Sequence, residues 1–426
     1  MPEGNMPEGS MNPVTRRSTL LGLTSLITLG RASLAVASAP TERRFVVIIL
    51  RGALDGMAAV VPYGDPGLAA LRPELIPPQP GQDNGLLDLG GKFGLHPALA
   101  RSHALYQANE LLIVHAVAGN YRVRSHFEAQ DFLESGADHR MTSGWLNRAV
   151  AAMPAASLNH TDASSCAIAI GASVPLLLRG RQAVANWAPH GFAEPQQSLY
   201  QAILNLNESD PVTGPAIMAG LRDRGFGDQA LAGTQMAGSE MADPQTDNDK
   251  NPRQPGGRFA FPALASAAGT LLKAADGPRI AAMELGGWDT HTGQNSRLVQ
   301  PLMQLDAGID ALRTSLGEAW SQTVVMVMTE FGRTARMNGT NGTDHGTGTV
   351  SFVAGGAVSG GKVVANWPGV GPGQLFEDRD LAPTTDLRSV AAGILTVHLE
   401  LPPAAITTVF PGGEPAQPMR GLIRTA

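Results

Sequence analysis

The stretch RRFVVIILRGALDGMAAVVP, residues 43–62, indicates the fold class. Its centre, residues 45–50, is a continuous apolar run, which is typical of a strand that is buried on both faces of a parallel sheet. A loop follows, and Asp55 lies in it five residues after the run. A lone Asp beside Gly is commonly a turn residue, but its place after the strand also makes Asp55 a candidate functional carboxylate.

The same order, an apolar run and then a polar loop, recurs five times along the chain. Segments with apolar residues at three- and four-residue spacing lie between the runs and predict helices. The runs are residues 110–119, 166–171, 279–287, 323–332 and 349–356, and the helical segments are residues 96–110, 125–136, 215–224, 262–275 and 296–320. This alternation predicts an α/β fold: a doubly wound, mostly parallel central sheet flanked by helices. In such sheets ligands bind outside the carboxyl ends of the strands.

Length, charge and cysteine content narrow the class of protein. We expect residues 40–426 to form a single domain, with a polar, aperiodic insert at about residues 225–258. A net charge of −6 without any cluster of Lys and Arg disfavours nucleic acid as a partner, which leaves a small-molecule substrate or a protein partner. Cys166 is the single cysteine, so any metal ion would be bound by His and carboxylate side chains.

Residues 1–39 have the three parts of an export signal. Arg16 and Arg17 precede an apolar run, residues 20–29, and Ala37 and Ala39 are the small residues before a predicted cleavage point. The paired arginines indicate the twin-arginine export machinery and a periplasmic or secreted protein. A membrane anchor is the competing interpretation, but an arginine interrupts the segment well short of the roughly 20 apolar residues that a span needs, and we expect no stable membrane span.

Two of the predicted loops carry side chains that are suited to chemistry. Ser125 stands where a helix is predicted to begin, and Glu128 three residues later fits a capping box. A hydroxyl at a helix start also lies among free backbone N–H groups, where it is suited to be a nucleophile. Asp289 and His291 follow another run two residues apart, so in an extended loop both side chains reach one cation; capping or an Asp–His hydrogen bond is the alternative.

The stretch after the fifth strand adds Glu330, Asp344 and His345. Glu330 ends an apolar run, and a buried carboxylate needs a cation as its partner. A metal ion is one such partner, and an ion pair with Arg333 is the other. No dense metal motif such as HExxH is present in the sequence, so the specificity of these signals comes from their recurrence at strand ends.

Taken in order, these residues resemble those of the alkaline phosphatase and sulfatase superfamily. More narrowly, the export signal and several short stretches look like an exported bacterial family of unknown function placed in that superfamily. The stretches include RGALDGM (51–57), GGWDTH (286–291), TEFGRT (329–334), TDHGTG (343–348) and PTTDLRSV (383–390). The resemblance covers nearly the whole chain after the signal and implies an alkaline phosphatase-like fold.

The resemblance also implies a role for each candidate residue. The implied ligands are Asp289, His291 and His345 for a first metal ion, and Asp55 and Glu330 for a second, with Asp344 or His126 as a further ligand. The implied catalytic groups are Ser125 as the nucleophile, His126 beside it, and Arg124 or Arg333 as the clamp on the substrate oxygens. Phe331 stands where the superfamily has a metal-binding histidine, so the second metal site is incomplete.

These roles imply a metal-dependent hydrolase of phosphate or sulfate esters in the bacterial envelope, acting on a small-molecule ester. The expected cofactor is a divalent metal ion, Mg²⁺, Ca²⁺ or Zn²⁺, and the oxygen-rich ligand set favours the first two. The alternative is a non-catalytic exported protein that retains the fold and binds an envelope partner. A formylglycine sulfatase is not favoured, because the stretch RSHFEAQ lacks the proline and arginine of that motif.

Overall fold

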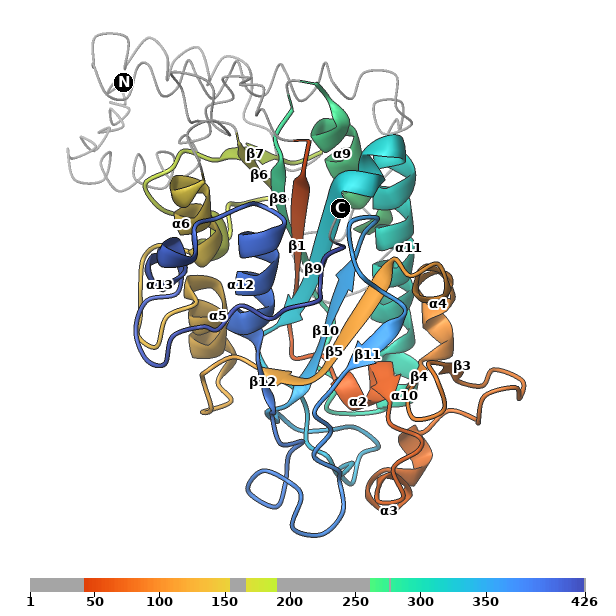
Figure 1. The fold of residues 1–426 in the computed structure, drawn as a ribbon. Helices are drawn as coiled ribbons and strands as arrows, with labels where there is room; N and C mark the ends of the chain where they lie inside the picture. The colour runs from red at the N-terminus through yellow and green to blue at the C-terminus, as the bar shows by residue number, and fades with distance from the viewer. Residues whose placement is uncertain (1–41, 154–165, 190–260, 276, 425–426) are drawn as a thin grey trace, which may run out of the picture.

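A computed structural model of the chain describes residues 42–153, 166–189, 261–275 and 277–424. The predicted export signal (1–39), the predicted insert (about 225–258) and the predicted helix at 215–224 lie outside the described residues. The described residues form a central sheet between two layers of helices (Figure 1).

The central sheet has nine strands within the described residues, in the order β11-β5-β10-β9-β1-β8-β6-β7, with β12 beside β5. They are β1 (Arg44–Leu50), β5 (Leu111–Ala118), β6 (Ala167–Ile170), β7 (Ala185–Trp187), β8 (Ile280–Leu285), β9 (Thr323–Thr329), β10 (Thr349–Ala354), β11 (Lys362–Val364) and β12 (Thr385–Asp386). β1 lies between β8 and β9 and is parallel to both. Every residue of β1 is buried, which explains why its sequence is a continuous apolar run.

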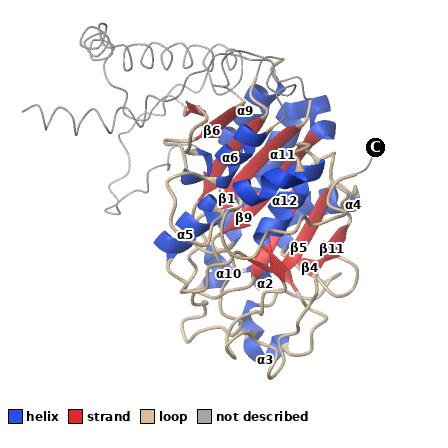
Figure 2. Cartoon of the chain, turned by 60° about the vertical axis from the view of Figure 1, so that its left-hand side comes forward, coloured by secondary structure: helices blue, strands red, loops and turns tan. Residues whose placement is uncertain are grey.

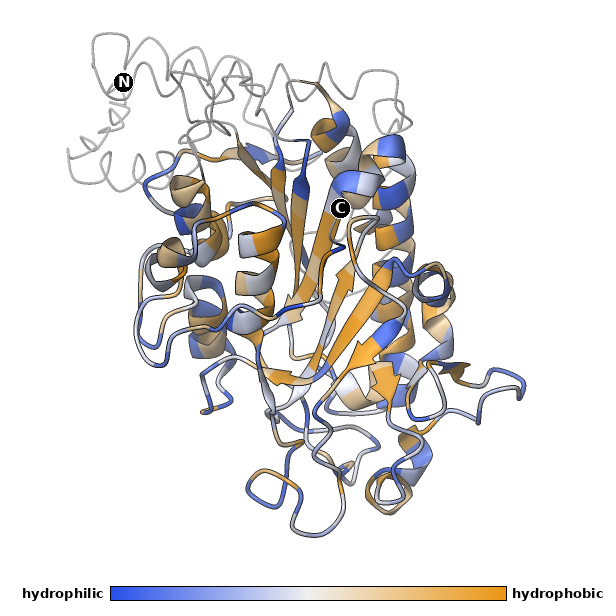
Figure 3. Ribbon diagram, in the orientation of Figure 1, coloured by the Kyte–Doolittle hydropathy of each residue, from blue (hydrophilic) through white to orange (hydrophobic). Residues whose placement is uncertain are grey.

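Helices cover both faces of this sheet (Figures 1 and 2). On one face, Val46, Ile48 and Leu50 of β1 pack into a core with α4 (Ala100–Gln107), α9 (Phe261–Lys273) and α11 (Val299–Leu316). On the other, the alternate β1 residues Phe45, Val47 and Ile49 pack into a core with α5 (His126–Ser135), α6 (Trp145–Ala152), α12 (Leu387–Val397) and α13 (Ile406–Val409). The strands are mostly hydrophobic, with a few polar positions, and the helices carry both hydrophobic and polar residues (Figure 3).

The predicted α/β fold, a mostly parallel sheet flanked by helices, is confirmed. All six predicted apolar runs are strands, and four of the five predicted helices lie in the described residues as helices. The sequence pattern predicted β10 as a strand but not its direction, which is antiparallel to both β5 and β9. It also missed α6, α12 and the short strands at the ends of the sheet.

Smaller elements fill the loops. A second sheet has the order β2-β4-β3, from β2 (Val60–Val61), β3 (Leu87–Asp88) and β4 (Gly94–Leu95). The short helices are α2 (Gly56–Ala59), α3 (Leu68–Leu71), α10 (Gln294–Arg297) and the 3-10 turns η1 (Pro73–Leu75), η2 (Pro97–Leu99), η5 (Leu176–Leu178), η6 (Gly317–Gln322) and η7 (Pro403–Ala405).

The strand directions place the candidate residues at one edge of the sheet. β1, β8 and β9 are parallel, and β5 has the same direction because β10 is antiparallel to both β5 and β9. The carboxyl ends of four strands and the start of β10 therefore meet at that edge. Asp55, Asp289 and Glu330 follow three of these ends, His126 begins the helix after β5, and His345 precedes β10. Among the described residues, no helix combines the length and hydropathy of a membrane span.

Two buried histidines are expected to weaken the fold in mild acid. His115 in β5 is fully buried; its Nε2–H donates to the Val60 carbonyl (2.9 Å) and its Nδ1 accepts from the Ala116 amide (2.8 Å), which requires the neutral ring. Burial lowers the pKa of His115 from 6.5 to about 4, and it does the same for His398, whose Nε2 faces the Arg44 carbonyl.

Between pH 6.5 and pH 4 the unfolded chain therefore binds more protons at these histidines than the folded protein does. The free energy of unfolding should fall by about 2 kcal/mol per histidine between pH 7 and pH 5. Urea unfolding of the full chain and of His115→Gln at both pH values tests this, because other titrating groups are common to the two proteins. An equal loss of stability in both would contradict the prediction.

Candidate metal centre

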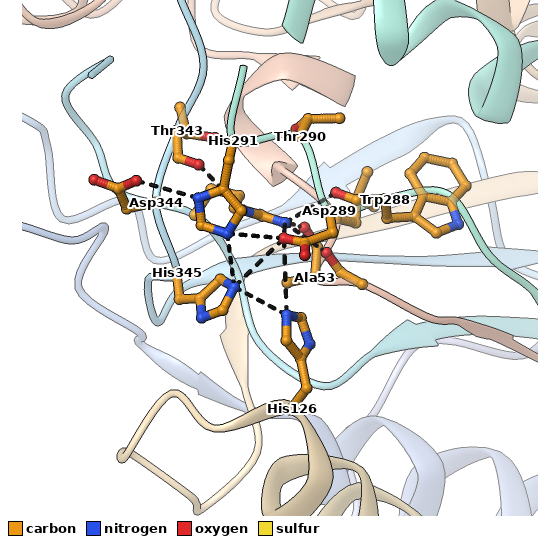
Figure 4. A network of polar contacts seen from close by, with 12 residues as sticks. Ala53, His126, Trp288, Asp289, Thr290, His291, Thr343, Asp344 and His345 are labelled. Atoms are coloured by element: carbon orange, nitrogen blue, oxygen red, sulfur yellow. Dashed lines mark hydrogen bonds and ion pairs between the residues drawn. The ribbon is translucent and has the colours of Figure 1, made fainter. Parts of the chain in front are cut away.

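Three histidines and one aspartate converge at the carboxyl edge of the sheet (Figure 4). His126 comes from the first residue of α5, Asp289 and His291 from the loop after β8, and His345 from the loop before β10. Nε2 of His345 lies 2.9 Å from Nε2 of His126 and 3.0 Å from Nε2 of His291. Oδ1 of Asp289 lies 3.0 Å from His291, 3.4 Å from His345 and 3.8 Å from His126, measured to each Nε2.

The opposite nitrogen of each ring faces an oxygen that accepts hydrogen bonds. Nδ1–H of His126 donates to Oε1 of Glu330 (2.8 Å), and Nδ1–H of His291 donates to Oδ1 of Asp344 (3.2 Å). Nδ1–H of His345 donates to the backbone carbonyl of Arg124 (3.2 Å). A carboxylate or carbonyl oxygen cannot donate, so the proton of each neutral ring lies on Nδ1.

The Nε2 atoms of His126 and His291 and Oδ1 of Asp289, which all accept hydrogen bonds, therefore lie around Nε2 of His345. Such a group of acceptors is repulsive unless a cation or shared protons lie among them. The outward contacts are those of metal-binding histidines, whose second nitrogen typically donates to a carboxylate or a carbonyl. Within the described residues, His126, Asp289 and His345 form a cluster that could hold a metal ion, with all ligand atoms within 4.8 Å of one another.

The spacing of the donor atoms also fits a metal ion. A tetrahedral ion with bonds of about 2.0–2.1 Å holds its ligand atoms roughly 3.3 Å apart. The contacts to His345 Nε2, at 2.9, 3.0 and 3.4 Å, and the distances from Asp289 Oδ1 to His291 (3.0 Å) and His126 (3.8 Å) lie within about 0.5 Å of that value. Three carboxylates, of Asp289, Glu330 and Asp344, surround the cluster and the Arg333 guanidinium offsets one of them, so the local charge favours a divalent cation.

The electrostatics favour the protonation states that ligands require. Burial lowers the pKa of His345, and the positive charge of Arg333, and that of His126 when it is protonated, lower it further. Burial raises the pKa of Asp289, but the hydrogen bond and charge of Arg333 outweigh it, and the net pKa is lowered. Burial likewise raises the pKa of Glu330, while the hydrogen bonds from His126, Gln130 and Gly52 bring it below the usual value. The carboxylates are therefore ionised and the His345 ring is neutral at neutral pH.

Glu330 contacts a ligand histidine rather than the centre of the cluster. Its Oε1 accepts from His126, from Gln130 Nε2 (3.2 Å) and from the Gly52 amide (2.9 Å), and its Oε2 accepts from the Thr329 hydroxyl (2.9 Å). The alternative of a Glu330–Arg333 ion pair is not what the structure has, because Arg333 contacts Asp289 and the carbonyls of Ala53, Gly52, Trp288 and Thr343 instead. All three guanidinium nitrogens of the buried Arg333 are used in this way.

Phe331 forms an apolar wall of the cluster. It is buried, and its ring centroid lies 4.9 Å from that of His126 and 5.2 Å from that of His345. The residue that stands in place of a histidine thus packs against two of the ligand rings and limits their rotation.

Asp55 lies outside the cluster, in a buried polar network of its own. Its carboxylate receives Nη1 of Arg72 at 3.0 and 2.7 Å and Nε2 of Gln294 at 2.6 Å, and it also caps α2 through the Met57 amide (3.1 Å). Oε1 of Gln294 in turn accepts from the hydroxyls of Thr290 (2.8 Å) and Thr343 (2.6 Å). Arg72 therefore takes the place of a metal ion as the cation on Asp55.

This network holds the ligand loops together. Thr290 lies between Asp289 and His291, and Thr343 lies two residues before His345. Gln294 therefore bonds to both loops that supply ligands to the cluster, and Arg72 extends the contact to the carbonyls of Thr334 and Ala335. Asp55, Arg72 and Gln294 are each about 1% exposed, so these bonds are shielded from water.

Arg124 and Ser125 directly precede the ligand His126 in the sequence. Ser125 is the N-cap residue of α5, as predicted, but its side chain makes no capping bond. The predicted capping box is wrong, because Glu128 accepts from the Tyr121 hydroxyl and pairs with Arg140. Arg124 has a positive φ of 62°, and its guanidinium pairs with Glu377 and the buried Asp380.

Two glycines allow the ligand loops to pack closely. A Cβ on Gly332 would lie 1.9 Å from the Gly348 carbonyl oxygen, and a Cβ on Gly342 would lie 2.1 Å from the His291 carbonyl oxygen. Gly332 therefore lets the two ends of the loop before β10 approach each other, and Gly342 lets that loop contact the loop after β8.

Sequence reasoning missed Arg72, Gln130 and Gln294, and it ranked His126 as a secondary ligand. Arg72 lies far from the ligands in the sequence, and Gln294 lies in the short helix α10. Neither residue stands at the end of a strand. The signal for His126 was present, since it opens the helix that follows β5 at the edge where the other candidates meet.

Residues 118–410 match a family described as "Protein of unknown function (DUF1501)". The chain belongs to this family. The matched region of this DUF1501 protein includes all four residues of the cluster, whereas Asp55 lies before it. No curated protein matches the sequence. Among solved structures, a magnesium-bound mutant of TAB5 alkaline phosphatase is similar, with 10% identity, coverage of 87% of this chain and 98% of that chain, and a TM-score of 0.31. The identity and the TM-score are both low, so function is inferred from the residues of this chain.

The cluster is expected to bind a divalent metal ion, and Glu330 is expected to tune its affinity. Glu330→Gln replaces the anionic acceptor of His126 with a neutral one, so affinity should fall by about 10- to 100-fold. His345→Ala removes the central ligand and should abolish tight binding. Zn²⁺ titration of the full chain in competition with a chromogenic chelator measures both effects. Glu318→Gln, at an exposed glutamate of η6, is the control; if it weakens binding as much as Glu330→Gln does, the assignment fails.

Loss of Gln294 should affect both stability and metal affinity. Gln294→Met leaves Asp55 and two threonine hydroxyls short of buried partners, which should cost about 2–4 kcal/mol of unfolding free energy. It also uncouples the two ligand loops, so metal affinity measured well below the unfolding midpoint should drop. The exposed Gln107→Met is the matched control. A Gln294→Met protein that is less stable but binds the metal ion as tightly as the unaltered chain would show that the network has no positioning role.

Proposed function

We propose that this DUF1501 protein is a metal-dependent hydrolase of phosphate or sulfate esters. The observation that carries the proposal is the convergence of three Nε2 atoms and a carboxylate oxygen, each ring being held by an acceptor on Nδ1. This geometry supports one metal centre. It does not support the two-metal site that the superfamily resemblance implies, because Asp55 is bound by Arg72 and Glu330 by His126.

The metal ion that fits this centre best is zinc. Imidazole nitrogen is a preferred ligand of Zn²⁺ and related transition metals, whereas Mg²⁺ and Ca²⁺ prefer oxygen. The proposed ligands are His126, Asp289, His291 and His345. The oxygen-rich ligand set expected from the sequence included Asp55 and Glu330. Because Asp55 is bound by Arg72 and Glu330 by His126, the proposed ligands are mainly nitrogen atoms, and zinc replaces Mg²⁺ or Ca²⁺ as the preferred ion. A bound Zn²⁺ would supply Lewis-acid polarisation of the ester oxygens.

Access to the centre supports catalysis over a purely structural ion. The side chains of Asp289 and His291 are 49% and 40% exposed, and those of His345 and His126 are 27% and 23% exposed. A structural zinc site is normally closed by its four ligands, whereas a catalytic one is open to substrate. The exposed side of this cluster gives a substrate access to the ion, where a substrate oxygen would add to the protein ligands as a further ligand.

Ser125 is the proposed nucleophile. It immediately precedes His126, and its hydroxyl is not used to cap α5. In the proposed reaction Ser125 Oγ bonds to phosphorus or sulfur, the ester oxygen leaves as the alcohol, and water then releases the anion and restores the hydroxyl. Phe331 and the outward contacts of the three rings hold the histidines in place.

Arg379 is better placed than Arg333 or Arg124 to contact an anionic substrate. Nη2 of Arg379 donates to the His345 carbonyl (2.7 Å), Nη1 pairs with one carboxylate, that of Asp380, at the longer distance of 3.5 Å, and the side chain is 40% exposed. Burial raises the pKa of Asp344, but the hydrogen bonds of Asn338 and His291 outweigh it, and the charge of Arg379 helps to bring the pKa below its usual value. Arg333 is buried with all its nitrogens engaged, and Arg124 is paired with two carboxylates.

A non-catalytic metal-binding protein of the envelope is the second candidate. Four protein ligands suffice to fill a tetrahedral site, as in structural zinc centres, and this observation favours it. Export by the twin-arginine machinery and a periplasmic or secreted location remain part of both proposals. They rest on residues 1–39, which lie outside the described residues.

The hydrolase proposal is tested with 4-nitrophenyl phosphate and 4-nitrophenyl sulfate, using the full chain loaded with Zn²⁺, Mg²⁺ or Ca²⁺. We expect turnover with Zn²⁺ on at least one ester, its loss in His345→Ala, and a fall in kcat of about 10³-fold or more in Ser125→Ala. Ser321→Ala, at an exposed serine, is the control. A protein that binds Zn²⁺ tightly and hydrolyses neither ester supports the non-catalytic candidate. Turnover that is unchanged in Ser125→Ala excludes Ser125 as the nucleophile.

A further inference from the structure

A cavity of about 600 Å³ lies apart from the four metal-ligand side chains. It is formed where β5 and β12 end at the carboxyl edge of the sheet, and its volume is in the range of small-molecule sites. Its lining residues are Gly119, Asn120, Tyr121, Arg122, Phe132, Asp138, Pro383, Thr384, Thr385, Asp386, Arg388, Gly413 and Glu414. Five of them belong to the stretch PTTDLRSV, which has no part in the metal centre.

Arg388 is a buried cation that lines this cavity and also a smaller void of about 20 Å³. It is 8% exposed, and it donates through Nε and Nη2 to the Asp386 carboxylate and through Nη2 to the Glu414 carbonyl. Its Nη1 is one of the buried nitrogens without a hydrogen-bond partner among the described residues. The ion pair with Asp386 explains two of the three nitrogens, and a buried unsatisfied donor calls for a partner.

Arg122 is a second cation in the same wall. Its Nη1 donates to the carbonyls of Gly119 and Tyr121, and it has no ion pair with a carboxylate of the described residues. Burial lowers the pKa of Arg122, the Asp386 charge opposes this shift, and the nearby charge of Arg388 adds to it. Two guanidinium groups thus share one cavity, and the one carboxylate between them is already bound by Arg388.

The remaining carboxylates of the cavity lie at its rim. Asp138 and Glu414 are both exposed, and Asp138 accepts from Nδ1–H of His139 (2.7 Å). The inner wall is therefore positive and the rim negative. Hydroxyl and amide groups of Thr384, Thr385 and Asn120 add neutral hydrogen-bonding capacity.

We propose that this cavity binds a small polar molecule with one oxyanion head, a carboxylate or a sulfate or phosphate monoester, and hydroxyl or amino groups on its body. The head contacts Arg122 and Arg388, since guanidinium groups bind such anions with paired hydrogen bonds. The body faces the threonines and the rim carboxylates. The site is independent of the metal centre and of the proposed hydrolysis.

Isothermal titration of the full chain with three probes tests the proposal: glucuronate, glucose 6-phosphate and glucose. We expect both anionic sugars to bind at least tenfold more tightly than glucose, and which of the two binds better identifies the head group. Binding should persist in His345→Ala, which separates this site from the metal centre. Equal affinity for all three probes, or loss of binding in His345→Ala, would overturn the proposal.

Arg122→Met is the decisive variant, because it removes the charge and keeps much of the side-chain length. It should weaken binding of the anionic sugars by tenfold or more and leave that of glucose unchanged.

Arg388→Met is less suitable, since Arg388 also bonds to the N-cap of α12 and borders a void of about 20 Å³ that is large enough for one water molecule. Thr384→Val is a milder second variant with a smaller expected loss, and Arg101→Met, on α4 across the sheet, is the control. Unchanged affinity in both Arg122→Met and Thr384→Val would exclude this cavity as the binding site.

Discussion

The meeting of three imidazole lone pairs with a carboxylate oxygen is the interaction on which the site depends. His345 Nε2 is within 3.0 Å of two other ring nitrogens, a separation that neutral rings maintain only around a cation or a shared proton. Each ring is kept from turning away by an oxygen on its Nδ1. The hydrogen bonds from the rings to Glu330, Asp344 and the Arg124 carbonyl offset this repulsion. These bonds preorganise the rings, and they determine which nitrogen is free.

A buried network beneath the cluster keeps its two main loops in register. Gln294 bonds to Thr290 and Thr343, and Asp55 joins Gln294 to Arg72. Both carboxylate oxygens of Asp55 accept hydrogen bonds, from Arg72, Gln294 and the Met57 amide, so they are already occupied by protein donors. Arg333 acts similarly on the other side, tying Asp289 to the carbonyls of the loop after β1. Arg72 and Arg333 therefore each supply the positive charge next to a buried or half-buried carboxylate, Asp55 and Asp289. This arrangement favours one metal centre over two.

The strand order explains how distant residues come together. Because β5, β8 and β9 end at the same edge, residues more than 200 positions apart, such as His126 and His345, come into contact. The apolar runs were long enough to predict these strands, and the polar residues just after them were therefore good candidates. Asp289, His291 and His345 were found in this way. The role of Glu330 was not, because a carboxylate at a strand end binds a metal ion or a ligand histidine equally well, and only the position of the His126 ring separates the two.

The sequence by itself determined the mostly parallel α/β sheet and the edge at which most of the candidate residues meet, because hydrophobic periodicity is local and strand ends follow from it. Tertiary structure alone decided the partners. A cation on Asp55 was required by its burial, but its identity as Arg72, 17 residues away, depends on how the loop after β2 folds back. The same holds for Arg333 with Asp289 and for the antiparallel direction of β10. Long-range pairing is set by the packing of the whole sheet, which no single stretch of sequence encodes.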